Sequence, residues 1–250
     1  MQGFGSVRVR FSSLDQAPTF DMHIKFYYAA GTNCCERVRW ALDYKRVPYE
    51  MVDLDQPHDE VNFAAISPFA RVPVMELNGI PLTESMAMVE LLEEIVPSPP
   101  LNYSDCLSRA RVREVCEAVN SSIHPVQNSS VVQFFRPEWS KNEMRPVRAN
   151  WIANNLAKLQ ARLWLDSGFA VGTAFTFADI FVAAIFRKGV SLGIERMALP
   201  EFNKHWSFLM SQPSVRASCP LSDARAVHAH TSTNGSARGE RPAAASGLQG

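Results

Sequence analysis

The chain has 250 residues, of which 46% are hydrophobic, so it can bury the core of one large domain or two small ones. Its 25 basic and 25 acidic residues cancel, which removes the electrostatic basis for binding nucleic acid or an anionic membrane surface. No apolar run reaches the roughly 18 residues of a transmembrane helix, and no signal-peptide hydrophobic region is apparent. We therefore expect no nucleic acid and no membrane among the partners.

Cysteine usage indicates a reducing compartment. The cysteines are odd in number and irregularly spaced, which argues against a disulfide framework and against a zinc cluster. The sequence therefore predicts a cytoplasmic location and no metal site. The cysteines are Cys34, Cys35, Cys106, Cys116 and Cys219.

The first part of the chain alternates strand and helix patterns after an expected N-terminal extension at residues 1–21. The order βαβαββα is the thioredoxin-like pattern, so we expect residues 22–98 to form a thioredoxin-like α/β domain. Asn78-Gly79 suits the type I′ turn of a hairpin. The expected elements are a strand at 23–29, a helix at 34–46, a strand at 49–54, a short helix at 60–66, hairpin strands at 73–77 and 80–83, and a helix at 85–96.

The second part of the chain is predicted to be helical throughout. The proline-rich "PSPP" at 97–100 forms a stiff linker. Residues 103–222 then carry helical periods at 112–119, 147–165, 177–187 and 200–210. The third of these is apolar nearly all round and is expected to be buried, with "TFAD" at 176–179 as a capping box. Residues 223–250 are rich in Ala, Ser, Gly, Arg and His and are expected to form a disordered tail.

The stretch "YYAAGTNCCERVRWAL" at 27–42 places a hydroxyl, an amide and two thiols at a strand-to-helix corner. A helix N-terminus lowers a thiol pKa, so Thr32 or the first-turn N–H groups could stabilise a thiolate bound here. The alternative is structural, because Asn33 with Glu36 three residues later can form a capping box. The two interpretations do not exclude each other.

Two further motifs suggest a groove that binds a peptide. In "ARVPVM" at 70–75, a cis Pro73 would turn the Val72 backbone outward to pair with an extended peptide; the alternative is an ordinary trans proline at a strand start. In "TESMAM" at 83–88, Glu84 and Ser85 stand at a helix N-terminus, which favours a carboxylate ligand. There the alternative is that Ser85 merely caps the helix.

Taken in order, these motifs resemble the cytosolic glutathione transferases, most closely the zeta class with its maleylacetoacetate and maleylpyruvate isomerases. The resemblance covers roughly residues 22–222. "TNCCERVRWAL" is similar to the zeta signature Ser-Ser-Cys-x-Trp-Arg-Val-Arg-x-Ala-Leu, and "SPFARVPVMELNGIPLTES" to the glutathione-site segment. "SIHPVQNSSV" at 122–131 is similar to a segment of the helical domain in that class.

The resemblance implies a glutathione transferase fold, glutathione as cofactor and particular residue roles. Thr32 falls at the first signature serine, which holds the glutathione thiolate, and Asn33 falls at the second. Val72 would pair with the cysteinyl backbone of glutathione, and His124 stands where the family carries a glutamine that reaches glutathione. The implied catalytic residues are Thr32, Asn33 and Cys34. The implied glutathione-binding residues are Thr32, Cys34, Arg71, Val72, Pro73, Glu84, Ser85 and His124.

The resemblance also implies a homodimer that acts on a small electrophilic substrate, in detoxification or aromatic catabolism. The chain departs from the signature at Asn33 and Glu36. Ser191 stands where isomerases carry an arginine for a substrate carboxylate, with Arg187 as the candidate replacement. The expected activity is thiol transfer to an electrophilic carbon or glutathione-dependent cis–trans isomerisation. The alternatives are a monothiol enzyme that uses Cys34, for thiol transfer or reductive dehalogenation, and a non-catalytic ligand-binding module.

Overall fold

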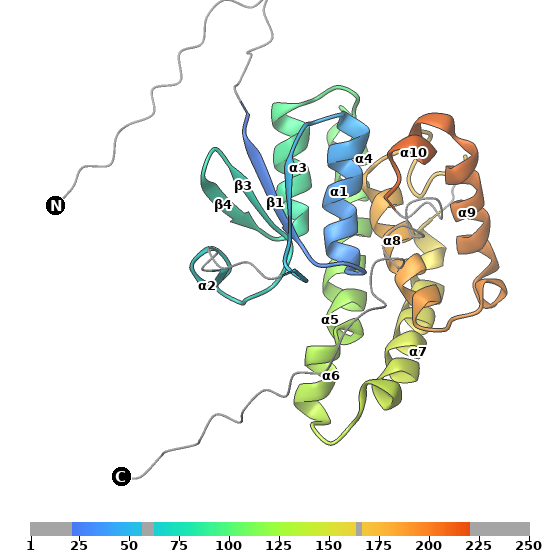
Figure 1. Cartoon of the computed structure of the whole chain (residues 1–250). Coiled ribbons are helices and arrows are strands. Elements are labelled where there is room, and N and C mark those ends of the chain that lie inside the picture. Colours follow the sequence, from blue (N-terminus) through green and yellow to red (C-terminus); the bar gives the residue numbers. More distant parts are fainter. Residues whose placement is uncertain (1–21, 57–62, 164–166, 221–250) are drawn as a thin grey trace, which may run out of the picture.

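The computed structural model describes residues 22–56, 63–163 and 167–220 (Figure 1). The expected N-terminal extension and C-terminal tail lie outside these residues. A four-stranded sheet in the order β2-β1-β3-β4 forms the first part, with β1 and β2 parallel and the other neighbours antiparallel. The strands are β1 (Ile24–Tyr28), β2 (Glu50–Asp53), β3 (Val74–Leu77) and β4 (Ile80–Thr83).

The hairpin between β3 and β4 forms where the sequence predicts it. Leu77 pairs with Ile80 across the turn. Asn78 and Gly79 have φ of 51° and 81°, and a type I′ turn requires φ above zero at both positions. The Asn78-Gly79 turn therefore sets the register of β3 against β4, the two strands that border one wall of the candidate site described below.

Helices α1 (Asn33–Lys45) and α3 (Ser85–Ile95) complete the thioredoxin-like pattern, together with the short α2 (Phe63–Ile66). The βαβαββα order is thus confirmed, although residues 60–62 of the expected second helix lie outside the described ranges. Figure 1 shows α1 and α3 between the sheet and the helical part. Both faces of α1 are consequently covered, and its buried residues include Val38, Trp40 and Leu42. Helix α1 also contacts α3, α8 and α10.

The linker at 97–100 is held by a buried cation. The Lys45 side chain is 0% exposed, and its Nζ lies 2.6 Å from Glu93 Oε2. The same Nζ donates to the carbonyl oxygens of Val96 at 2.7 Å and Pro99 at 2.9 Å. A buried charge is tolerated when it is paired and hydrogen-bonded, so Lys45 fastens the linker to the end of α1.

The second part is helical, as expected. A single helical run passes from α4 through a π-helical segment, η1, into α5. The helices are α4 (Cys106–Glu117), η1 (Ala118–Ile123), α5 (His124–Gln127), α6 (Ser129–Phe135), α7 (Lys141–Leu159), α8 (Phe177–Ser191), α9 (Pro200–Ser211) and α10 (Pro213–Ser218), with short 3₁₀ turns η2 (Gln160–Arg162) and η3 (Arg196–Ala198). No helix within the described ranges is long and apolar enough to cross a bilayer.

Helix α7 differs from its prediction. The helical period predicts a start at residue 147, whereas α7 begins at Lys141 and contains Pro146. The reason is a capping box in which the Ser140 hydroxyl accepts from Glu143 N and the Glu143 carboxylate accepts from Ser140 N. The cap initiates the helix far enough upstream that the proline lies inside it.

Helix α8 is the centre of the helical part. The predicted capping box is confirmed, with the Thr176 backbone N–H donating to Asp179 Oδ2 at 2.8 Å. The buried Asp179 also accepts hydrogen bonds from Ala170 N and His205 Nε2. The helix extends past the expected end at 187 to Ser191, and this added turn carries Lys188 to the site.

Candidate active site

The strand-to-helix corner is shaped by its backbone. Gly31 has φ of 70°, which turns the chain from β1 into α1. Thr32 occupies the N-cap position without a side-chain cap, and its hydroxyl donates to Ala29 O at 2.8 Å. The alternative capping box of Asn33 and Glu36 is therefore wrong for this structure. The first turn of α1 keeps N–H groups that a ligand can use.

The loop before β3 faces this corner. The Val72–Pro73 bond is cis, as predicted. The Cys34 thiol donates to Val72 O at 3.3 Å and so links the two segments. The Ser67 hydroxyl donates to Arg71 O and accepts from Arg71 N, both at 2.9 Å, which braces the loop from behind.

The start of α3 forms the third edge of the site. Glu84 has φ of 71° immediately before the helix. Ser85 is the first helical residue and is buried, but no side chain caps α3. The alternative in which Ser85 serves as the cap is thus wrong. The uncapped N–H groups and the positive end of the helix dipole suit a carboxylate.

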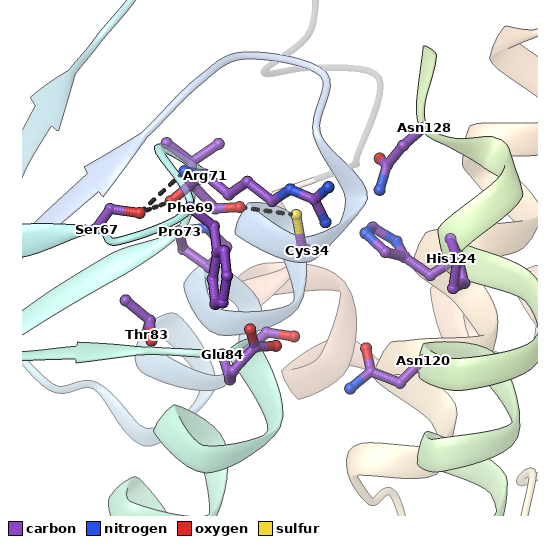
Figure 2. Close-up of a pocket in the computed structure, with 13 residues that line it drawn as sticks. Cys34, Ser67, Phe69, Arg71, Pro73, Thr83, Glu84, Asn120, His124 and Asn128 are labelled. Atoms are coloured by element: carbon purple, nitrogen blue, oxygen red, sulfur yellow. Dashed lines mark hydrogen bonds between the residues drawn. The ribbon is translucent and has the colours of Figure 1, made fainter. Parts of the chain in front are cut away.

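These three edges enclose one side of a cavity of about 400 Å³, and helices η1 and α5 form the other side. Figure 2 shows Cys34 between the two walls, with Arg71, Pro73 and Glu84 facing Asn120 and His124. The remaining lining residues include Ser67, Phe69, Val72, Thr83, Ser85, Pro125 and Asn128.

A fully buried arginine joins the two walls. Arg37 is 0% exposed and donates to Asn120 Oδ1 and to Asn33 Oδ1, each at 2.8 Å. Its guanidinium also lies over the Phe181 ring at 4.3 Å. The prediction missed this residue, because Arg37 stands between Glu36 and Arg39 in a segment whose charges do not reveal which of them is buried.

His124 is held as a neutral acceptor. Burial, and then the charges of Arg37, Arg71 and Lys188, lower the pKa of His124 to about 3. Its Nδ1 lies 3.1 Å from Asn33 Oδ1, which Arg37 fixes as an acceptor, and 3.2 Å from Gln127 Nε2; we assign the proton to Nδ1 on the shorter contact. His124 Nε2 is then unprotonated and can accept a hydrogen bond from a ligand N–H.

The adjacent thiols of Cys34 and Cys35 in α1 differ in pKa and in exposure. A hydrogen bond from the Cys35 thiol, and then the charge of Arg37, lower the pKa of Cys34 to about 7 despite the opposing effect of burial. Burial raises the pKa of Cys35 well above the ordinary thiol value. Cys34 is half-buried and lines the cavity, whereas Cys35 is 2% exposed. At neutral pH, Cys34 is the thiol of this pair that ionises.

A second hollow of about 350 Å³ lies beside Cys34 and is cationic. It is lined by Arg71, Arg148 and Lys188, and none of the described lining residues is acidic. Lys188 Nζ donates to Gly31 O at 2.8 Å, and Arg148 Nε donates to Gln127 O. Burial and the Arg148 charge lower the pKa of Lys188, so a bound anion would relieve this repulsion.

The candidate replacement for the missing isomerase arginine is not where the sequence suggested. Arg187 lies over the Trp206 ring at 4.9 Å and does not line either cavity. The Ser191 hydroxyl donates to Lys188 O within its own helix. Lys188, one residue after Arg187, faces the site because each helical step turns a side chain by about 100°.

The structure brings most of the predicted site residues together. Seven of the eight glutathione candidates line the first cavity. Thr32 lines the second hollow instead, together with Asn33. Their roles toward a ligand stay predictions. Sequence reasoning missed Arg37, Asn120, Gln127, Arg148 and Lys188.

Comparison with known proteins gives one domain model and many relatives. The model "Glutathione S-transferase, N-terminal domain" matches residues 26–100. Rat maleylacetoacetate isomerase is 32% identical over 158 residues, which cover 61% of this chain and 71% of the relative. An Anaeromyxobacter dehalogenans maleylacetoacetate isomerase solved with glutathione is 29% identical, with a TM-score of 0.68 over 80% of this chain and 95% of that one. A Methylobacterium extorquens maleylacetoacetate isomerase solved with malonate and glutathione is 27% identical, with a TM-score of 0.70 over 79% and 96%.

The lowered pKa of His124 predicts a specific pH dependence. Its folded pKa of about 3 lies below the ordinary value of 6.5, so the unfolded chain takes up the extra proton as the pH falls through this window. His124 therefore makes the fold lose stability between pH 6.5 and pH 3. We expect the wild type to lose about 2 kcal/mol more than His124→Gln between pH 7 and about pH 4.5. Urea unfolding of both proteins at each pH measures this, and parallel stability curves would contradict it.

Proposed function

The chain belongs to the zeta class of glutathione S-transferases, with the maleylacetoacetate isomerases, and on this premise we propose that it uses glutathione to isomerise an unsaturated carboxylate. The observation that carries the proposal is the pairing of two adjacent cavities. One is bounded by Cys34, Val72 and the uncapped start of α3, and the other is lined by cations. A tripeptide thiol and an anionic substrate would meet at Cys34, which lines both.

Glutathione binding is supported by four features of the first cavity. The Val72 backbone beside cis Pro73 offers an edge for the cysteinyl unit of the peptide. The start of α3 at Glu84 and Ser85 suits the γ-glutamyl carboxylate. The Nε2 acceptor of His124, on the opposite wall, can receive a peptide N–H. Arg71 supplies a cation for a second carboxylate.

The chemistry follows from placing a thiolate beside a conjugated alkene. The glutathione thiolate adds to one alkene carbon, and the electron pair moves onto the conjugated carbonyl oxygen. The former double bond rotates as a single bond, after which the electron pair returns and expels the thiolate. Lys188 and Arg148 would hold the substrate carboxylate during the rotation. The neighbour solved with malonate shows that a relative binds a dicarboxylate together with glutathione.

The function is tested with maleylpyruvate and maleylacetoacetate as substrates. We expect glutathione-dependent conversion to the fumaryl isomers, followed by absorbance. Lys188→Met should raise KM about tenfold, because a charge-assisted hydrogen bond contributes about 1.5 to 3 kcal/mol and 1.4 kcal/mol is a factor of ten. Lys158→Met, at an exposed position of α7, is the matched control. Glutathione binding without turnover of either substrate would favour a non-catalytic module.

We also propose that the Thr32 hydroxyl stabilises the thiolate of bound glutathione. The Thr32 hydroxyl donates to Ala29 O, so the hydroxyl must turn toward the glutathione sulfur when glutathione binds. Thr32→Val keeps the shape but removes the donor. It should raise the pKa of bound glutathione by about one to two units, since one unit is about 1.36 kcal/mol.

Titrating the thiolate absorbance of bound glutathione measures this shift, with Cys34→Ala as the comparison. If the valine variant titrates like wild type while the alanine variant shifts, Cys34 is the supporting group instead.

We propose a homodimer in which the sheet edge of one copy packs on the helical part of the other. Exposed apolar side chains lie on both surfaces, among them Ile80 on edge strand β4 at 71% and Leu107 on α4 at 69%. Two-fold dimers are the commonest soluble assembly. Light scattering should give twice the monomer mass of 27.9 kDa at micromolar concentration.

A matched pair of variants makes the dimer prediction sharper. Leu107→Lys should shift the equilibrium toward monomer. Met197→Lys introduces the same charge at a position that is 73% exposed but lies between α8 and α9, and should leave the dimer intact. A wild-type mass of one monomer would refute the proposal.

The cysteines support a reducing location, for which we propose the cytoplasm. In the described residues, none of the five forms a disulfide. A cell fractionation in which the protein appears in an oxidising compartment would contradict this location.

A further inference from the structure

We propose that Cys34 gives this site a second activity, glutathione-dependent reduction of mixed disulfides by a monothiol route. This inference rests on the proposed glutathione binding and extends it, because Cys34 would react covalently with the glutathionyl sulfur. The chemical class of substrate is a glutathione mixed disulfide, G–S–S–R, with glutathione itself as the reductant.

The position of Cys34 is the first argument. Its Sγ lies 3.3 Å from Val72 O, the backbone group proposed to anchor the cysteinyl unit of glutathione. When the cysteinyl backbone of glutathione pairs with Val72, the glutathione sulfur is only one side chain away from that backbone. It must therefore approach Cys34. The Thr32 hydroxyl is directed to Ala29 O, away from this contact. Figure 2 shows the Cys34 sulfur facing the space between the two walls.

The environment of Arg37 is the second argument and is independent of the first. The side chain is fully buried, its hydrogen bonds go to two neutral amide oxygens, and its Nε has no partner. Burial lowers the pKa of Arg37 to about 10, and a negative charge on Cys34 is the foremost influence opposing this, ahead of Cys116 and Glu117. A buried cation without a hydrogen-bonded carboxylate is stabilised by an anion nearby, and a Cys34 thiolate supplies one.

The state of the thiol fits the chemistry of exchange. The most effective attacking thiol has a pKa close to the ambient pH, and the pKa of Cys34 is lowered to about 7. Lys188, on the far side of the second hollow, adds a further positive charge toward Cys34. Cys34 is thus partly thiolate at neutral pH while remaining a good nucleophile.

The route must be monothiol because Cys35 cannot resolve the intermediate. Cys35 is buried, and burial raises its pKa, so it stays protonated and out of reach of the ligand. Adjacent Cα atoms are about 3.8 Å apart, shorter than the 4.4 to 6.8 Å usual across a disulfide. Both residues also lie in the first turn of α1, whose helical backbone does not let neighbouring residues adjust to the geometry of a disulfide.

The steps balance with glutathione as the only reductant. The Cys34 thiolate attacks the glutathionyl sulfur of G–S–S–R, which forms Cys34–S–S–G and releases RS⁻, and the latter takes a proton from water. A second glutathione thiolate then attacks the glutathionyl sulfur of the intermediate, which forms oxidised glutathione and returns Cys34 as thiolate. Each turnover consumes one free glutathione, which ends in oxidised glutathione together with the glutathionyl unit of the substrate, and releases one R–SH.

The experiment uses the full chain and the mixed disulfide of glutathione with 2-mercaptoethanol. Turnover is followed by coupling oxidised glutathione to glutathione reductase and NADPH. We expect Cys34→Ser to lower the rate at least about 100-fold, because a hydroxyl cannot replace the thiolate nucleophile. Cys106→Ser, at the exposed cysteine that begins α4 and lines neither the first cavity nor the second hollow, is the matched control and should stay within about threefold of wild type.

Two direct measurements on the wild type keep the inference testable if a variant fails to fold. Treatment with oxidised glutathione should add one glutathionyl group, mapped to Cys34 by mass spectrometry of the peptides. Alkylation of Cys34 by iodoacetamide should rise with pH around a midpoint near 7.

The outcomes separate this inference from the proposed function. Exchange at the wild-type rate in Cys34→Ser, or modification that maps elsewhere, overturns the inference. A wild-type protein that binds glutathione by calorimetry and isomerises its substrate but performs no exchange overturns the inference alone. Failure to bind glutathione at all overturns both.

Discussion

The buried guanidinium of Arg37 is the constraint on which the site depends. It connects the first turn of α1 to η1 through Asn33 and Asn120, two residues that belong to different parts of the chain. Since it fixes Asn33 Oδ1 as an acceptor, it also fixes the tautomer of His124 on the opposite wall. After the hydrogen bond from Cys35, the same charge contributes to lowering the pKa of Cys34. The Arg37 guanidinium thereby aligns the two walls of the cavity. It also determines which nitrogen of His124 accepts a hydrogen bond, and it favours the thiolate form of Cys34.

The π-helical segment η1 explains how the helical run that packs Val112, Val115 and Cys116 into the core also reaches this cation. Such segments insert one residue into the α-helical ladder and occur frequently at functional sites. Here η1 lies directly between α4, whose Val112, Val115 and Cys116 are buried, and α5, which begins with His124. The change in helical pitch allows the same continuous run to face the core in its first half and the ligand cavity in its second.

The features that the sequence predicts correctly are those that depend on residues close together in the chain. The Asn78-Gly79 hairpin, the Thr176–Asp179 capping box and the order of elements all follow from residues a few positions apart. The start of α7 was mispredicted because the helical period from residue 147 was read without the Ser140–Glu143 capping box upstream.

The parts of the site that escaped prediction are non-local. Arg37 and Asn120 are separated by 83 residues, and no sequence pattern pairs them. The choice between Arg187 and Lys188 depends on the rotational phase of α8, which differs by about 100° between neighbours and is settled by packing against α1 and α7. The cations of the second hollow come from α7, α8 and the loop before β3, so only folding assembles them.

Lys45 has a consequence for how ligands enter. By bonding Glu93 and the carbonyls of Val96 and Pro99 at once, it holds the linker against the thioredoxin-like part, while contacts of α1 with α8 and α10 hold that part against the helical part. The cleft between the walls is therefore preformed, and a ligand finds it open without a rigid-body closure to drive. Binding then requires little reorganisation of the protein. Ligands of different affinity should therefore differ in their dissociation rates more than in their association rates.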